Sequence, residues 1–81
     1  MPRKTTLYPN APELAQLGAA IRRARKAAGI AQETLAHDAG IERSYFGALE
    51  RGEVNPTFMV LVKVSRELGA PLADLLADAR L

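Results

Sequence analysis

The sequence has no cysteine and only one histidine among its 81 residues. Without cysteine there are no disulfides and no thiolate metal sites, which makes a cytoplasmic location natural. A single histidine does not suffice for a histidine-based metal centre, so we predict neither a metal nor a cofactor. The chain also lacks a nucleophile–base pair and a phosphate-binding glycine loop. We therefore predict that it is not an enzyme.

Long apolar runs are missing as well. None approaches the roughly 20 residues that cross a bilayer, and the N-terminus lacks a signal-peptide core, so no membrane partner is expected. The net charge is +2, from 11 basic and 9 acidic residues. A balance this weak does not by itself indicate a nucleic-acid partner, because the distribution of charge matters more. A chain of this length forms one small domain, which oligomerisation would help to stabilise.

What the sequence does contain is helix after helix, with no strand-like alternation. Residues 1–9 hold two prolines and no helical period, which predicts a flexible arm, and residues 10–81 are predicted to form a single domain. Asn10 is a candidate cap for the first helix, and Thr57 for the fourth. The pattern predicts an all-α fold of five helices, over about 10–28, 31–39, 42–51, 57–68 and 71–79.

The stretch from Gln32 to Arg51 predicts two short helices that cross at a tight turn. Gly40 lies where the chain must turn, and glycine takes a left-handed backbone conformation without steric cost. Apolar residues fall on the inside of the corner: Leu35, Ala39, Ile41, Phe46 and Leu49. Such a corner holds one helix on a scaffold while the next projects outward, as a major-groove reader requires. The alternative is an ordinary helical hairpin in another all-helical domain.

Four segments carry a resemblance to a known family: LGAAIRRARKAAGI, QETLAHDAGI, RSYFGALERGEVNPT and ELGAPLADLL. Together they span roughly residues 14–76 and resemble the Xre family, the lambda-repressor and Cro-like helix-turn-helix proteins. The run RSY, LERG and NPT, in a short chain, is most similar to the controller proteins of restriction–modification systems, which are small dimeric regulators. The resemblance implies a compact five-helix lambda-repressor-like domain that binds double-stranded DNA through its second and third helices.

Two positions depart from the family pattern. Ala31 stands where a serine or threonine usually caps the second helix, and a missing cap typically costs about 1 kcal/mol. Glu42 begins the third helix, where a serine, threonine or aspartate is common. A carboxylate suits a helix N-terminus but repels phosphate, which disfavours DNA contacts nearby.

The third helix is predicted to read DNA. Arg43, at its N-terminus, could donate two hydrogen bonds to a guanine. Ser44 could serve a base or a phosphate, and Gly47 and Ala48 are small enough to let the helix approach the groove. Tyr45 could contact DNA or pack on the second helix. With Gln32, which the resemblance makes a phosphate anchor, the predicted DNA-binding residues are Gln32, Arg43, Ser44, Tyr45, Gly47, Ala48, Arg51 and Asn55.

Glu50 is expected on the buried side of the third helix, where an unpaired carboxylate is costly. Arg25 lies beside the apolar stripe of the first helix, and in the family the matching residues form an ion pair between these helices. The resemblance therefore implies a structural ion pair between Arg25 and Glu50. The other arginines nearby, Arg22 and Arg23, are interpreted mainly as solvated helix surface.

The C-terminal third has more apolar residues than one small core needs. The fourth helix is expected to bury Phe58, Leu61, Val64, Ser65 and Leu68, and further apolar residues remain on it and on the fifth helix. Small soluble domains rarely expose so much apolar surface, so we predict a homodimer with Met59, Val60, Leu72 and Leu76 in the interface. The alternative is that a single domain folds the excess into its own core.

These expectations combine into a functional hypothesis. The protein is predicted to be a sequence-specific transcriptional regulator, a homodimer on a pseudo-palindromic operator, of the restriction–modification controller kind. It would act by occupancy, either blocking RNA polymerase or recruiting it. The alternative is an antitoxin, or another protein-interaction module, whose partner docks on the apolar surface of the fourth and fifth helices. The neighbouring gene would discriminate between the two.

Overall fold

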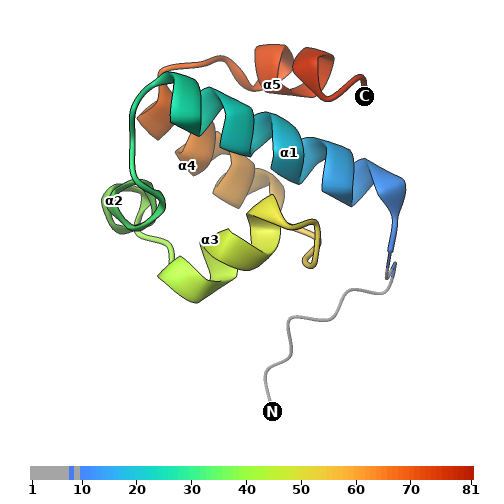
Figure 1. Cartoon of the computed structure of the whole chain (residues 1–81), viewed down its shortest axis with the longest axis horizontal. Helices are drawn as coiled ribbons and strands as arrows, with labels where there is room; N and C mark the ends of the chain where they lie inside the picture. The colour runs from blue at the N-terminus through green and yellow to red at the C-terminus, as the bar shows by residue number, and fades with distance from the viewer. Residues whose placement is uncertain (1–7, 9) are drawn as a thin grey trace.

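Five helices follow one another in the computed structural model, which describes residues 8 and 10–81. They are α1 (Pro12–Ala27), α2 (Gln32–Ala39), α3 (Arg43–Glu50), α4 (Phe58–Leu68) and α5 (Leu72–Asp78), and no strand occurs in the described part (Figure 1). The predicted all-α fold of five helices is confirmed. The predicted arm, residues 1–9, lies outside the described residues except for Tyr8. No helix of the described part is both long and apolar enough to span a membrane.

The helix starts follow the predicted capping in part. Thr57 caps α4, where its hydroxyl accepts a hydrogen bond from the Val60 N–H at 3.2 Å. Ala31 precedes α2 without a side-chain cap, as its missing hydroxyl predicts. The predicted cap at Asn10 is wrong, because α1 begins at Pro12 with Ala11 in the capping position. Asn10 instead adopts a left-handed conformation, φ 63°, just before the helix.

The turn between α2 and α3 is set by Gly40, which has φ 70° and ψ 33°. This left-handed conformation brings the N–H of Ile41 back to the Ala36 carbonyl at 2.8 Å. The bond satisfies a carbonyl at the end of α2 and redirects the chain within two residues. The turn therefore fixes the direction in which α3 leaves α2, as the sequence predicts.

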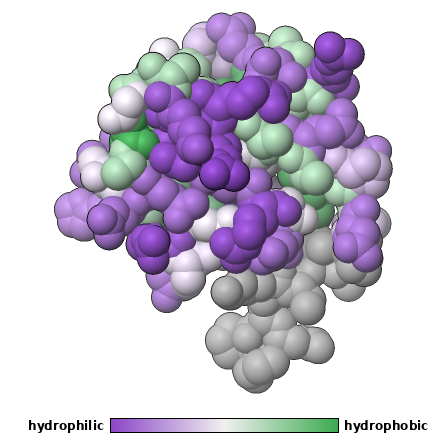
Figure 2. Space-filling view, in the orientation of Figure 1, coloured by the Kyte–Doolittle hydropathy of each residue, from purple (hydrophilic) through white to green (hydrophobic). Residues whose placement is uncertain are grey.

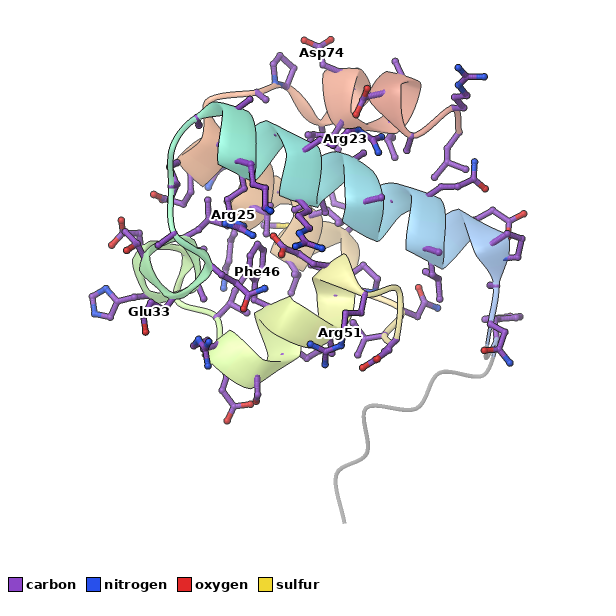
Figure 3. All side chains as sticks on the ribbon, in the orientation of Figure 1. Arg23, Arg25, Glu33, Phe46, Arg51 and Asp74 are labelled. Carbon is purple, nitrogen blue, oxygen red and sulfur yellow. The ribbon has the colours of Figure 1, made fainter. Side chains whose placement is uncertain are left out.

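The helices enclose one apolar core. Helix α1 packs on α3 and α5, α2 packs on α3 and α4, and α4 contacts α5. Figure 3 shows Phe46 pointing from α3 into the interior beneath α1. The largest fully buried side chains come from four helices: Phe46, Ile21, Leu35, Leu49 and Val64. Burying each of these side chains contributes about 1.5–3 kcal/mol to the stability of the fold. Because Leu35, Phe46 and Leu49 belong to α2 and α3, the corner formed by these two helices is part of the core.

Phe58 was predicted to lie in the core, and this prediction is wrong: the residue is 67% exposed. Phe58 is the first residue of α4, six positions before the buried Val64. Six residues place the two side chains about 120° apart around the helix axis. Val54, in the segment before α4, is buried in the core. Phe58 therefore joins Met59, which is 54% exposed, as apolar surface on α4.

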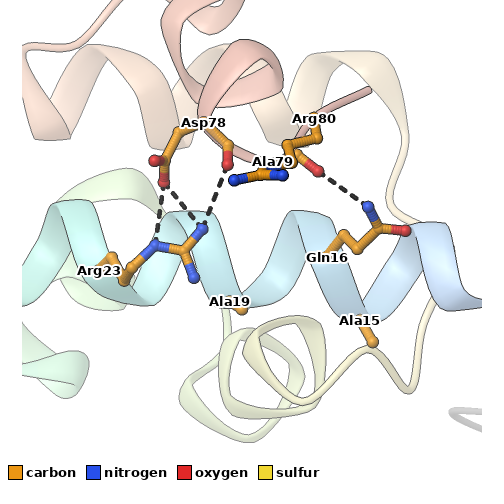
Figure 4. Close-up of a pocket in the computed structure, with 7 residues that line it drawn as sticks. All are labelled: Ala15, Gln16, Ala19, Arg23, Asp78, Ala79 and Arg80. Atoms are coloured by element: carbon orange, nitrogen blue, oxygen red, sulfur yellow. Dashed lines mark hydrogen bonds and ion pairs between the residues drawn. The ribbon is translucent and has the colours of Figure 1, made fainter.

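The C-terminal helix is held on α1 by polar contacts (Figure 4). Arg23 donates from Nε and Nη2 to the Asp78 carboxylate at 3.1 and 2.9 Å, and Gln16 donates to the Ala79 carbonyl at 3.0 Å. These residues line a groove of about 340 Å³ between the two helices. Arg23 is thus exposed but paired, which corrects its interpretation as plain solvated surface. An exposed pair of this kind contributes about 0–1 kcal/mol.

Helices α1 and α3 are in close backbone contact at Gly18. A Cβ atom built on Gly18 would lie 2.4 Å from the Leu49 carbonyl oxygen and 2.6 Å from that of Glu50. Both neighbours are backbone atoms, which cannot rotate away as a side chain could. The absence of a side chain at residue 18 therefore sets the spacing between the two helices.

We expect Gly18→Ala to destabilise the fold by about 1–3 kcal/mol or more, because the methyl group forces α1 away from α3. Gly47→Ala is the matched control within a helix. Its Cβ would lie 3.3 Å from Arg51 Nη1, a flexible side-chain atom, and alanine gains about 1 kcal/mol of helix propensity. Thermal or urea unfolding of both variants tests this expectation. Equal losses of stability would contradict the account of the α1–α3 contact.

Candidate nucleic-acid interface

The N-terminal end of α3 lies at the surface, directly after the turn at Gly40 (Figure 1). Arg43 and Ser44 are both exposed there. Ser44 Oγ donates a 2.7 Å hydrogen bond to the Glu42 carboxylate. Arg43, by contrast, has no hydrogen-bond or ion-pair partner among residues 8 and 10–81. The structure thus presents an uncommitted guanidinium at the end of the helix that projects from the corner.

The C-terminal half of α3 is enclosed. Every residue from Phe46 to Glu50 is buried. Ala48 is 0% exposed and belongs to the core, so the prediction that it faces DNA is wrong. A helix packed on one side only would have left it outside, but α3 lies against both α1 and α2. Gly47 is also buried, under the side chains of Gln32 and Arg51, so any approach to DNA at this position involves those side chains.

A polar hollow of about 310 Å³ lies where α1, α2 and α3 meet. We call it the α1–α3 hollow, and its lining is Arg22, Arg25, Gln32, Gly47, Glu50 and Arg51. Figure 2 shows the molecule in the orientation of Figure 1, with α1 and α3 toward the viewer. This face is largely hydrophilic. Three of the six lining residues are arginines and one is a glutamate, so the lining itself carries more positive than negative charge.

The inner wall of the hollow is an ion pair. Arg25 Nε donates to Glu50 Oε2 at 2.7 Å, and Arg25 Nη2 donates to Oε1 at 3.1 Å. The two side chains are 9% and 3% exposed. Arg25 Nη1 also donates to the Ile30 carbonyl at 2.9 Å. The structure therefore brings together the two residues that the sequence paired, and Figure 3 shows Arg25 extending from α1 toward α3.

Gln32 joins this pair from the first turn of α2. Its Nε2 donates a 2.9 Å hydrogen bond to Glu50 Oε1. The side-chain amide predicted to hold a phosphate is therefore engaged inside the protein. The N–H groups of the first turn of α2 have no intrahelical partner, so the backbone at Gln32 retains donors for an anion.

Arg51 follows α3 directly, at the rim of the hollow (Figure 3). Its Nε and Nη2 donate to the two carboxylate oxygens of Glu53, both at 3.0 Å. The hydrogen bond to Glu53 raises the pKa of Arg51 above its usual value. Sequence reasoning named Arg51 but missed Glu53, because the two residues are joined across a turn where helical spacing gives no signal.

The two remaining predicted DNA-binding residues, Tyr45 and Asn55, differ in their exposure. Tyr45 is half-buried and packs against the core, and burial raises the pKa of its phenol. The hydroxyl therefore stays protonated at neutral pH and is available as a donor. Asn55 is exposed in the segment between α3 and α4.

The four residues predicted for a dimer interface lie on α4 and α5. Met59 is exposed, whereas Val60, Leu72 and Leu76 are half-buried and pack against the core. Phe58, which the sequence assigned to the core, is the more exposed neighbour of Met59. No group of three or more potential metal ligands occurs in the described part of the chain.

With this geometry established, comparison with known proteins identifies the class. The helix-turn-helix family matches residues 21–75, from the middle of α1 into α5. The chain belongs to this family, in its Xre type, and is a DNA-binding transcriptional regulator. An uncharacterised HTH-type transcriptional regulator of Sinorhizobium fredii is 32% identical over 59 residues, 73% of this chain and 77% of that protein.

Two solved structures are similar over most of their length. The clp gene regulator ClgR of Corynebacterium glutamicum is 34% identical with a TM-score of 0.81, and the match covers 84% of this chain and 88% of that one. The restriction–modification controller protein C.AhdI of Aeromonas hydrophila is 35% identical with a TM-score of 0.78, covering 80% and 98%. The resemblance to the Xre family and its controller proteins is thereby confirmed.

The ion pair between Arg25 and Glu50 is expected to affect the stability of the fold. Glu50→Ala leaves the Arg25 guanidinium buried without its partner, and we expect a loss of about 3–5 kcal/mol in the free energy of unfolding. Arg25→Ala together with Glu50→Ala should cost much less than the two single losses added together. Glu67→Ala, at an exposed position of α4, is the control and should change stability by less than about 0.5 kcal/mol. Additive losses in thermal melts would show that the two side chains act independently.

Proposed function

We propose that this regulator binds a pseudo-palindromic operator as a homodimer and acts as a restriction–modification controller protein. The observation that carries the proposal is Arg43, an exposed guanidinium at the projecting end of α3 that has no partner among residues 8 and 10–81. Similarity to C.AhdI, which the match covers almost completely, supports the controller assignment. The similar proteins described above are regulators, and they favour this hypothesis over an antitoxin.

In this proposal, the exposed N-terminal end of α3 reads the bases. In helix-turn-helix proteins the N-terminal residues of the second helix of the motif reach the base edges in the major groove. An arginine there can donate two parallel hydrogen bonds to guanine O6 and N7. Arg43 needs no internal ion pair to be broken before it does so. Ser44 must exchange its bond to Glu42 for a DNA contact.

The residues around the α1–α3 hollow bind phosphates of the DNA backbone in this proposal. Arg22 and Arg51 lie at its exposed rim, and the first turn of α2 supplies backbone N–H groups at Gln32. Backbone donors and arginines at a helix N-terminus are typical phosphate contacts, which fix the register of the protein on DNA without reading sequence. Asn55, exposed after α3, is a further candidate for such a contact.

The proposed dimer forms through α4 and α5. Phe58 and Met59 form exposed apolar surface on α4, next to the half-buried Val60. Burying this surface against a second copy would place two α3 helices on one face of the DNA, about one helical turn, ~34 Å, apart. The bound dimer would then block RNA polymerase or recruit it.

The role of Arg43 in base reading predicts a specific loss. Arg43→Ala should weaken binding to the operator by about 1–3 kcal/mol and relax the preference at one position in each half-site. Arg66→Ala removes an exposed cation from α4 and should leave the preference unchanged. Gel shifts on the operator and on single-base variants measure both. An equal loss on operator and random DNA would make Arg43 a phosphate contact instead.

The dimer proposal is tested at Met59. Met59→Glu places a charge in the proposed interface without disturbing the core, since the side chain already lies outside it. Sedimentation should show dimers for the wild type and monomers for the variant. Monomers of the variant should then bind each half-site independently, without the gain in affinity that a tethered second module provides. Thr34→Glu, on the exposed face of α2, should remain dimeric. A wild type that stays monomeric at high concentration while binding a palindrome tightly would refute the proposal.

A further inference from the structure

The two arginines at the ends of α3 differ in their hydrogen-bond partners. Arg43 has no partner within the described residues, whereas Arg51 is held by Glu53 through two hydrogen bonds of 3.0 Å. The Arg51 and Glu53 side chains are 55% and 50% exposed, so the pair lies at the surface. It also lies at the rim of the α1–α3 hollow, where we place a DNA phosphate.

The edge of Arg51 that Glu53 occupies is the edge that a phosphate would use. A carboxylate and a phosphate both accept two parallel hydrogen bonds from a guanidinium, through the same fork of N–H groups. Nε and Nη2 of Arg51 are taken by the carboxylate. The third nitrogen, Nη1, lies over Gly47, 3.3 Å from where a Cβ would be. A phosphate that engages Arg51 side-on must therefore displace Glu53.

We propose that Glu53 is an internal competitor for a DNA phosphate at Arg51, and that it lowers the affinity of the protein for all duplex DNA. The inference rests on the proposed function, because it assumes that the rim of the hollow meets the DNA backbone. Its effect is independent of sequence, since phosphate contacts carry no base information. Glu53 thus weakens binding to random DNA without touching the base reader at Arg43.

The gain from removing the competitor is the decisive quantity. Glu53→Gln keeps the shape of the side chain but removes its charge. We expect it to bind operator and random duplex more tightly by the same factor, about two- to five-fold at physiological salt. The slope of log K against log salt should steepen by up to about 0.9, the contribution of one further neutralised phosphate. Fluorescence anisotropy on both duplexes over a salt series measures these changes.

Two further variants separate the mechanism from a simple change of net charge. Asp74→Asn makes the same change at an exposed position of α5 that points away from the other helices (Figure 3), and it should leave affinity and slope close to those of the wild type. In an Arg51→Ala background, Glu53→Gln should have no effect, because there is no guanidinium left to compete for. A gain that persists in that background would assign the effect to direct repulsion of DNA by Glu53 and overturn the proposal.

The remaining outcomes are equally informative. If the wild type binds duplex DNA but Glu53→Gln binds no more tightly than Asp74→Asn, the competitor proposal fails and the proposed function stands. Weaker binding by Glu53→Gln would show that Glu53 holds Arg51 in place for DNA, which is the opposite role. If the wild type binds neither duplex, even at low salt, both proposals fail together.

Discussion

The carboxylate of Glu50 joins the three helices that form the proposed DNA interface. It belongs to α3, and it accepts hydrogen bonds from Arg25 on α1 and Gln32 on α2. The contact at Gly18 brings α1 and α3 close enough for this arrangement. A buried ion pair adds little net stability compared with an apolar core, but breaking one is costly. Its main consequence here is geometric, because it fixes where α3 and the first turn of α2 face outward together.

This packing divides α3 into two parts with different roles. Residues from Phe46 onward fill the space between α1 and α2, and Phe46 itself is fully buried. Only the first turn, with Arg43 and Ser44, remains at the surface, together with Arg51 just beyond the last turn. The guanidinium of Arg43 is available at once, whereas that of Arg51 is neutralised by Glu53. In the proposed interface, base reading and phosphate attraction are therefore assigned to different residues, Arg43 and Arg51.

The sequence predicted most of the fold because its signals are local. The turn at Gly40 and the cap at Thr57 each follow from a few adjacent residues, and the structure has both. Ala48 and Phe58 were misplaced because their burial depends on neighbouring helices: α3 is covered on two sides, and Phe58 begins α4 on the side away from Val64. The pairing of Glu53 with Arg51 depends on the turn after α3, which no periodic pattern encodes. The ion pair between Arg25 and Glu50 was thus predictable through the family resemblance, whereas the pairing of Arg51 with Glu53 was not.

The central claim is that two copies of α3 read two related half-sites. Selecting bound sequences from a pool of random duplex DNA with the wild-type protein tests it most directly. The account predicts enrichment of two inverted half-sites whose centres lie about 10 base pairs apart, each with a guanine at a fixed position. A single asymmetric site, or no enrichment at all, would contradict it.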